Sequence, residues 1–127
     1  MTPYTAVFRR LFATAQENID TYDYLPDGSA EYPFAYIGES YGSERGAVDL
    51  VGDLRQTIHL YGTRTQRNDL DQAMKRIHDD LLRLVDSYGY YTKMNDFTVQ
   101  VIQDTSTNTP LIHYVIEVGL TYTKKER

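Results

Sequence analysis

Apolar residues recur at helical spacing in two stretches of the chain. In residues 5–19 they stand on one side of a helix that Thr5 can cap. In residues 68–88 they follow the same period, with Asn68 as N-cap and Gly89 as the stop signal. The predicted apolar faces are Val7, Phe8, Leu11, Phe12, Ala15 and Ile19, then Leu70, Ala73, Met74, Ile77, Leu81, Leu84, Val85 and Tyr88.

Four other stretches have the pattern of β-strands. Residues 32–41 are rich in aromatic and β-branched side chains, and their proline stands near the start of the run. Residues 54–62 and 96–104 place apolar side chains at alternate positions. Residues 111–123 alternate without a break, so one face of this last strand must be buried.

The segments between these elements predict the connections. Residues 42–53 contain three glycines and several charged residues before any clear period, so we expect a long loop or mobile arm there. Residues 105–110 have the composition of a hairpin turn.

The pattern as a whole predicts an α+β fold in the order α-β-β-α-β-β. We expect two helices packed on one face of a mostly antiparallel sheet of four strands, or slightly more. No repeat or composition break divides the 127 residues, so residues 1–127 are predicted to form a single domain.

Composition excludes several classes of chemistry. The chain has no cysteine, which rules out disulfides, thiolate metal sites and cysteine nucleophiles. It contains none of the common metal, phosphate-binding or serine-nucleophile motifs. Apolar runs are far shorter than the roughly 20 residues that span a bilayer, and the first residues do not form a secretory signal. We therefore expect a protein of the cytosol, or of a particle built there.

The net charge of −5 argues against tight binding to nucleic acid. Basic residues cluster only at the end of the chain, in Lys124, Lys125 and Arg127. A groove that displaces counterions from a DNA backbone needs a more extended basic surface.

His59 and His113 are the best candidates for a reactive site. Each lies on the side of its strand opposite the more apolar series, so the two rings could meet if their strands pair. Two half-exposed strand histidines are the simpler interpretation, and His78 lies apart on the second predicted helix.

Two functional hypotheses follow from the residues alone. One is a small acidic enzyme or ligand-binding domain that uses His59 and His113. The other is an interaction protein that assembles through its sheet, because the chain has twelve tyrosines and four phenylalanines and tyrosine is enriched at protein interfaces. The assembly hypothesis needs an open sheet edge, exposed aromatic residues and an arm that orders on contact, for which residues 42–53 are the candidate.

Three stretches carry a resemblance to a known family. They are Tyr32-Pro-Phe-Ala-Tyr-Ile-Gly-Glu-Ser, Gln56-Thr-Ile-His-Leu-Tyr-Gly, and the pair Asp104-Thr with His113-Tyr-Val-Ile-Glu-Val. Together they resemble the tail completion or tail terminator proteins of long-tailed bacteriophages, over roughly residues 30–123. The tyrosine-rich residues 20–32 and the glycine-rich residues 42–53 depart from the family pattern.

The resemblance implies a structural role without catalysis, metal or cofactor. Such minor tail proteins form a ring, commonly a hexamer, that caps the tail tube and ends its polymerisation. The ring then provides the head-tail joining surface. Implied partners are further copies of the chain, the major tail tube protein and a neck or connector protein. Duplex DNA only passes through the channel, no membrane is involved, and the location is the virion tail or neck after assembly in the host cytoplasm.

The expected subunit and tail contacts lie on the strands, on residues 42–53 and on the hairpin turn. They are Tyr32, Tyr36, Tyr41, Glu44, Arg45, Asp49, Leu50, Tyr61, Asp104, Tyr114 and Tyr122. A head-tail connector or head completion protein of similar fold is the nearest alternative, and the enzyme that uses His59 and His113 is a distant one.

Overall fold

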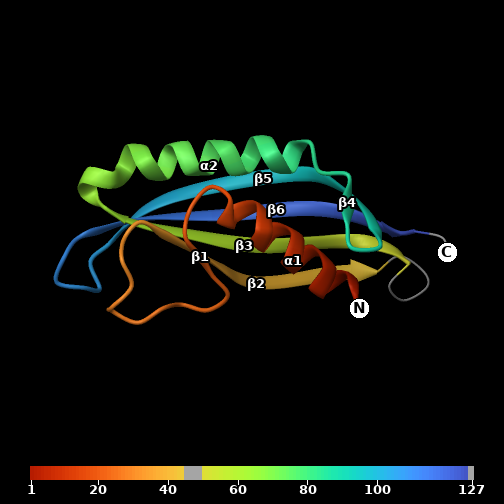
Figure 1. The fold of residues 1–127 in the computed structure, drawn as a ribbon, viewed down its shortest axis with the longest axis horizontal. Helices are drawn as coiled ribbons and strands as arrows, with labels where there is room; N and C mark the ends of the chain where they lie inside the picture. The colour runs from red at the N-terminus through yellow and green to blue at the C-terminus, as the bar shows by residue number, and fades with distance from the viewer. Residues whose placement is uncertain (45–49, 126–127) are drawn as a thin grey trace.

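Six strands form one sheet, and two helices lie on the same face of it (Figure 1). The computed structural model describes residues 1–44 and 50–125. The elements, in chain order, are α1 (Pro3–Gln16), β1 (Thr21–Tyr22), β2 (Phe34–Glu44), β3 (Val51–Thr63), the 3₁₀ turn η1 (Arg64–Gln66), α2 (Arg67–Leu82), β4 (Asp86–Ser87), β5 (Tyr90–Asp104) and β6 (Leu111–Lys124).

The strand order across the sheet is β1-β2-β3-β6-β5-β4. The four long strands β2, β3, β6 and β5 pair antiparallel with one another, whereas β1 pairs parallel with β2. Both end strands are two residues long, so each covers only a small part of its neighbour. Most of the outer edge of β2 and of β5 is therefore left without a strand partner among the described residues.

The predicted fold class is wrong in strand number and order. The sheet is a six-stranded, mixed and curled half-barrel rather than a mostly antiparallel four-stranded one. The additional strands β1 and β4 fall in stretches expected to be a loop and the end of a helix. A two-residue strand has no period of its own, and only its distant partner makes it a strand.

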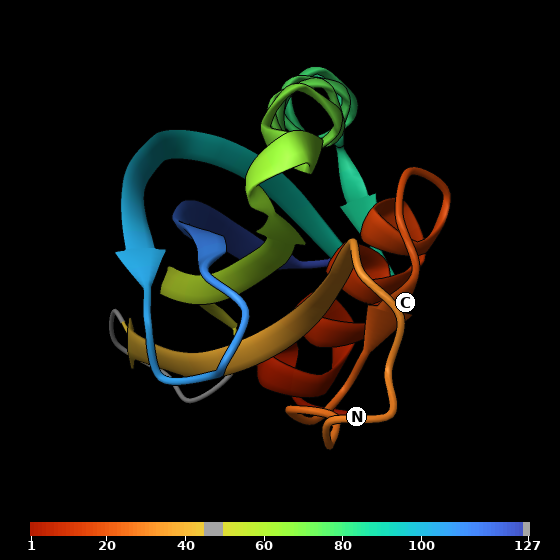
Figure 2. The ribbon, with the colours of Figure 1, turned by 90° about the vertical axis from the view of Figure 1, so that its left-hand side faces the viewer.

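The sheet curls around α1 (Figure 2). The end strands β1 and β4 lie at opposite edges of the sheet, and both contact this helix. Near β4, Arg10 of α1 lies 3.6 Å from an Asp86 carboxylate oxygen and its guanidinium stacks 4.7 Å above the ring of Tyr88. α1 thus fills the concave face, which we call the helix face; the opposite side of the sheet is the open face.

The hydrophobic core lies between the helices and the helix face. Alternate residues of β3 and β6 point into it, and Ile58 and Ile116, which are directly paired, are both fully buried. Leu11 of α1 and Ile77 of α2 close the core from the other side. Burial of these aliphatic side chains is the main term that stabilises the fold. Neither α1 nor α2, the two α-helices described, is long and apolar enough to cross a membrane.

Two predicted boundaries are also wrong. The second helix ends at Leu82, and Val85 and Tyr88 lie in the following segment, which turns at Tyr88 and Gly89 with positive φ angles of 44° and 97°. Of the expected loop over residues 42–53, residues 42–44 and 51–53 are strand, because β2 continues to Glu44 and β3 begins at Val51, and residues 45–49 lie outside the described residues.

Candidate functional site

The open face carries a cluster of six aromatic rings from β2, β3, β6 and the residues before β2. We call this the Tyr–His cluster; it comprises Tyr32, Phe34, Tyr36, His59, Tyr61 and His113. Strand register brings them together, because His59 lies opposite Tyr36 on one side, and Tyr61 lies between Phe34 and His113. The resemblance to tail terminator proteins rests on the stretches that supply these rings.

The two histidines hydrogen-bond directly. His59 Nδ1 lies 2.8 Å from His113 Nε2, so the structure brings together the pair that the sequence singled out. On the other side of its ring, His59 Nε2 lies 3.2 Å from Glu39 Oε1. A carboxylate only accepts, so Nε2–H of His59 donates to Glu39, and Nδ1 is then free to accept from Nε2–H of His113.

A β-bulge in β2 places Glu39 in this chain of hydrogen bonds. The pairing register between β2 and β3 shifts between Ile37 and Ser40, which leaves the carbonyls of residues 38 and 39 outside the ladder. The buried side chain of Gln56 compensates, since its Nε2 donates to the Gly38 carbonyl at 2.9 Å and to the Glu39 carbonyl at 3.1 Å. Gln56 therefore has a structural role that explains its place in the sequence pattern.

Stacking explains how the histidines are buried on a face that no helix covers. The rings of Tyr61 and His113 stack with centroids 4.1 Å apart, and those of Tyr36 and His59 with centroids 4.5 Å apart. As a result both histidines are only 9% exposed. The rings shield one another from water laterally, as aromatic pairs on one sheet face do.

Burial sets the ionisation of the cluster. Burial and, to a smaller extent, the nearby His59 ring lower the pKa of His113 to about 4. Burial also raises the pKa of Tyr61 to about 12 and raises the pKa of Tyr36. At neutral pH His113 is uncharged and both phenols are protonated. A general acid or base works best with a pKa near the operating pH, so these groups are poorly suited to proton transfer.

In the other half of the open face, charged side chains of β3, β5 and β6 form ion pairs with one another. Arg55 Nη2 lies 2.7 Å from Asp96 and 3.2 Å from Glu117, and these contacts raise the pKa of the guanidinium. Next to them, Asn95 donates to the Thr121 hydroxyl at 2.7 Å, and that hydroxyl donates to Asp53 at 3.2 Å. These six side chains are therefore hydrogen-bond or ion-pair partners of one another.

No candidate metal site is present in the described part of the chain. Within residues 1–44 and 50–125 no group of three or more histidine or carboxylate side chains is arranged to hold a metal ion. Glu39, His59 and His113 form a line of hydrogen bonds rather than a set of ligands converging on one point. Nor does this line leave a free ring nitrogen of His59 to bind a cofactor.

The predicted contact residues divide among three locations. Tyr32, Tyr36 and Tyr61 belong to the Tyr–His cluster. Asp104 lies beside it at the end of β5, where hydrogen bonds from Ser106 lower its pKa. Tyr41, Glu44 and Leu50 are exposed around the far ends of β2 and β3, whereas Tyr114 and Tyr122 are buried on the helix face. Arg45 and Asp49 lie outside the described residues.

Sequence reasoning missed the second half of the open face and the exposed part of β5. Arg55 stands on the open side of the alternation in residues 54–62, a signal that could have been used. Its partners Asp96 and Glu117 come from distant positions, and only the pairing of β3, β6 and β5 brings them together. As expected, a strand contains Val99, Val101 and Ile102, but no pattern in the sequence indicated that all three are exposed.

Comparison with known proteins adds no relative. No protein-family model matches the chain, and no curated protein matches it.

Proposed function

We propose that the chain is a structural subunit of a bacteriophage tail, which caps the tail tube as a ring and forms the surface that joins head and tail. The observation that carries the proposal is the one-sided sheet. Both helices cover one face (Figure 1). On the other face, which lies open, Arg55 pairs with Asp96 and Glu117, and His59 hydrogen-bonds Glu39 and His113. Such a face is suited to contact or to line a channel, and it lacks a converging reactive group.

Residues from the three stretches that resemble tail terminator proteins lie close together in the fold, and this supports the proposal. Tyr32, Gln56 and His113 come from three of the stretches that resemble tail terminator proteins. In the fold, Tyr32 and His113 belong to the Tyr–His cluster. Gln56 hydrogen-bonds the bulge in β2, and this bulge places Glu39 within hydrogen-bond distance of His59. A shared structural role gives a physical reason for these residues to occur together in such a family.

The charge of the open face is consistent with DNA passing along it. The described strands β2, β3, β5 and β6 place five carboxylates there against two cations; they are Glu39, Asp53, Asp96, Asp104 and Glu117, with Lys93 and Arg55. An acidic channel wall repels the phosphate backbone and keeps the duplex from binding. We expect no measurable affinity for duplex DNA even at low salt, and tight binding would contradict this part of the proposal.

The ionisation of the cluster disfavours the enzyme alternative. His113 is neutral and buried, and it is hydrogen-bonded to His59. Changing both histidines to alanine separates the hypotheses. Loss of an activity with assembly intact would indicate an enzyme, whereas we expect loss of folding stability or assembly only.

Size measurement with and without tail tubes tests the proposal. The purified chain is examined by light scattering and electron microscopy, alone and mixed with tail tubes of the phage that encodes it. Rings of one size, or caps at tube ends, are expected. Binding to isolated necks but not to tubes would favour the connector role, and a monomer indifferent to both would contradict the proposal.

A further inference from the structure

The second half of β5 is exposed in an unusual way. Residues 98–103 are exposed on both faces of the sheet, and β4 pairs only with Tyr90 and Tyr91, so no described strand covers their outer edge. Val99 is 38% exposed, Val101 43% and Ile102 38%. The segment Thr-Val-Gln-Val-Ile-Gln has no charge and no proline. An edge strand of this kind pairs readily with another strand, and natural proteins rarely leave one uncovered.

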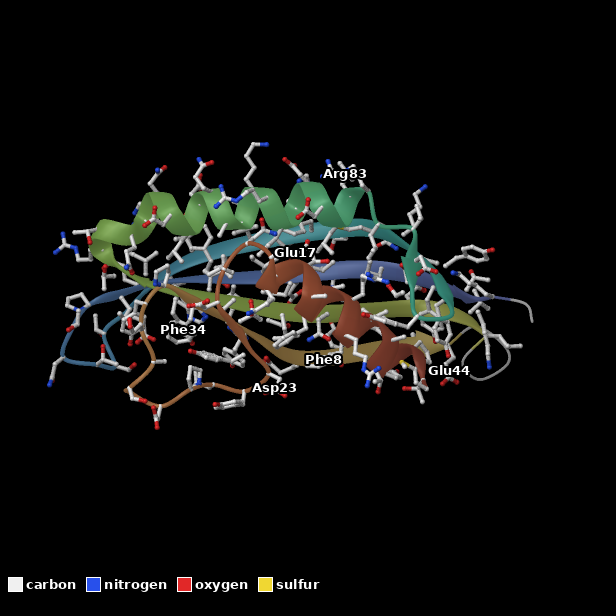
Figure 3. The ribbon with its side chains drawn as sticks, viewed as in Figure 1. Phe8, Glu17, Asp23, Phe34, Glu44 and Arg83 are labelled. Carbon is white, nitrogen blue, oxygen red and sulfur yellow. The ribbon has the colours of Figure 1, made fainter. Side chains whose placement is uncertain are left out.

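The opposite side of the same sheet offers a second open edge. β1 pairs only with Ala35 and Tyr36, so β2 has no outer strand partner from Gly38 to Glu44 among the described residues. Tyr41 is 61% exposed there. Figure 3 shows Phe34 and Glu44 at opposite ends of β2, so this open half lies away from the Tyr–His cluster.

Strand direction makes these two edges compatible. The four long strands alternate in direction across the sheet, so β5 runs opposite to β2. In a ring, each copy is related to the next by a rotation about the ring axis, and this rotation does not reverse the direction of a strand along that axis. The β2 strand of a second copy can therefore lie antiparallel to β5 of the first. A sheet extended in this way stays antiparallel throughout, and the contact is of the head-to-tail type that closes into rings.

The side-chain pattern selects a register. Paired residues must point to the same face; Tyr41 and Ile102 both point to the open face, while Gly42 and Val101 point to the helix face. Placing Tyr41 opposite Ile102 sets an aromatic ring against a β-branched chain. It also sets polar residues against each other, Ser43 against Gln100 and Ser40 against Gln103. A shift of two residues would place Ile102 opposite Glu39 in one direction and opposite Ser43 in the other, whereas the chosen register places Val99 opposite Glu44.

Tyr4 of α1 lies over Gly42 on the helix face, at the position that Val101 of the neighbour faces in this register. A Cβ at Gly42 would lie 2.8 Å from the Asp53 carbonyl oxygen and 2.9 Å from the Tyr4 hydroxyl. The ring of Tyr4 therefore fills the space above Gly42, and it is still 37% exposed. A valine from a neighbouring strand can cover that ring.

The stagger implied by this register fits a closed barrel. Directly across the sheet, Tyr41 is in line with Arg55, Gly119 and Asp96, whereas Ile102 lies six positions further along β5. At about 3.3 Å per residue this is a shift of about 20 Å over four strand spacings, which total about 19 Å. The strands then tilt about 45° from the ring axis, at the upper end of the tilts found in barrels.

We propose that β5 residues 99–103 of one subunit pair antiparallel with β2 residues 40–44 of the next copy, with Ile102 opposite Tyr41. This inference rests on the proposed function, because it assumes that the chain forms a ring. It adds which strand segment of the next copy pairs with each open edge. Repeated around the ring, the contact makes one continuous sheet whose helices all lie on the same side. For the open face to line the channel, this sheet must bend at each contact between copies against the curl that it has around α1 within a subunit (Figure 2).

Cysteine cross-linking tests the pairing directly. The chain has no cysteine, so only introduced thiols react. Tyr41→Cys with Ile102→Cys is expected to give, under mild oxidation, a ladder of multimers that reductant removes. The matched control is Tyr41→Cys with Val101→Cys, in which the two thiols point to opposite faces. It should cross-link less by about tenfold, because disulfides need close and facing Cβ atoms.

The single variants decide between this contact and others. Neither Tyr41→Cys nor Ile102→Cys alone should cross-link. A dimer from Ile102→Cys alone would mean that β5 pairs with β5 of a second copy, which overturns the proposal. Rings or tube caps without cross-links in the double variant would also overturn it and leave the proposed function standing, whereas a monomer that ignores tubes contradicts both.

A second pair of variants covers the case in which the cysteine variants fold poorly. Val101→Lys keeps the strand but places a charge at the contact, and Val101→Ile keeps it apolar. Val101→Lys is expected to be monomeric at concentrations where the wild type and Val101→Ile form rings. Unchanged assembly of Val101→Lys, with native circular dichroism, would overturn the proposal.

Discussion

The two faces of the sheet bury their side chains by different means. On the helix face, aliphatic residues such as Ile58 and Ile116 are covered by α1 and α2 and lose all exposure to water. On the open face, His59 and His113 reach 9% exposure with no helix above them, because flanking rings and a hydrogen bond shield them. The first face depends mainly on apolar area, with a few buried hydrogen bonds such as those of Gln56, whereas the second depends more on geometry and ionisation.

Removing apolar volume from the helix face should have the largest effect on stability. Ile116→Ala deletes a fully buried side chain between the helices and β3 and leaves a cavity. We expect a loss of about 2–5 kcal/mol in the free energy of unfolding, measured by urea denaturation. A loss below about 1 kcal/mol would mean that this face is loosely packed.

Lowering the pH should act on the open face through His113. The pKa of His113 is about 4 in the folded chain and about 6.5 when unfolded, so the unfolded chain binds the proton more readily. Stability is fully present above pH 6.5 and falls as the pH drops from there to 4, by about 2 kcal/mol after allowance for solvent at the ring edges.

His113→Gln is the control for this titration. The glutamine amide can still donate to His59 Nδ1, but it does not titrate. Thermal unfolding between pH 7 and 4 should show a flatter stability profile for this variant than for the wild type. Identical slopes would show that the pH dependence has another origin.

Removing the bulge support should have a smaller effect. Gln56→Ala leaves the carbonyls of Gly38 and Glu39 without their side-chain donor. We expect a loss of about 1–2 kcal/mol. Because Glu39 then loses its fixed position, hydrogen exchange in residues 37–40 should rise more than in the helix face; equal rises on both faces would argue against the assigned role.

Substitution at the open edge should have the least effect on stability and the greatest on assembly. Val101 is 43% exposed, so Val101→Lys should change the free energy of unfolding by less than about 0.5 kcal/mol. Chemical denaturation of the monomeric variant measures this. A large loss would show that Val101 belongs to the core of its own subunit rather than to a contact surface.

The comparison of faces also shows how far the sequence could predict the structure. Alternation in residues 111–123 identified the buried face of β6, and the opposite phase put His59 and His113 on the other face of their strands, because both follow from a period of two. Pairing between strands that are far apart in the sequence could not be predicted in the same way. β1 forms only where Thr21 and Tyr22 meet Ala35 and Tyr36.

Glycine misled the prediction at residues 42–53. Gly52 reads as a loop residue, yet it lies in β3, where a Cβ would stand 2.5 Å from the Ser43 carbonyl oxygen and 2.6 Å from the Tyr122 hydroxyl. Close packing of strands and a buried tyrosine requires glycine there, and sequence alone does not separate that need from flexibility. The same limit applied to Val85 and Tyr88, which fit a helical period although the chain turns at Tyr88 and Gly89.

Assembly is the central claim, and native mass as a function of concentration tests it most directly. The wild-type chain, alone or seeded with tail tubes, should pass from monomer to a closed ring of a single size, and Val101→Lys should remain monomeric under the same conditions. A wild-type chain that stays monomeric at every concentration, with tubes or without, would contradict the account.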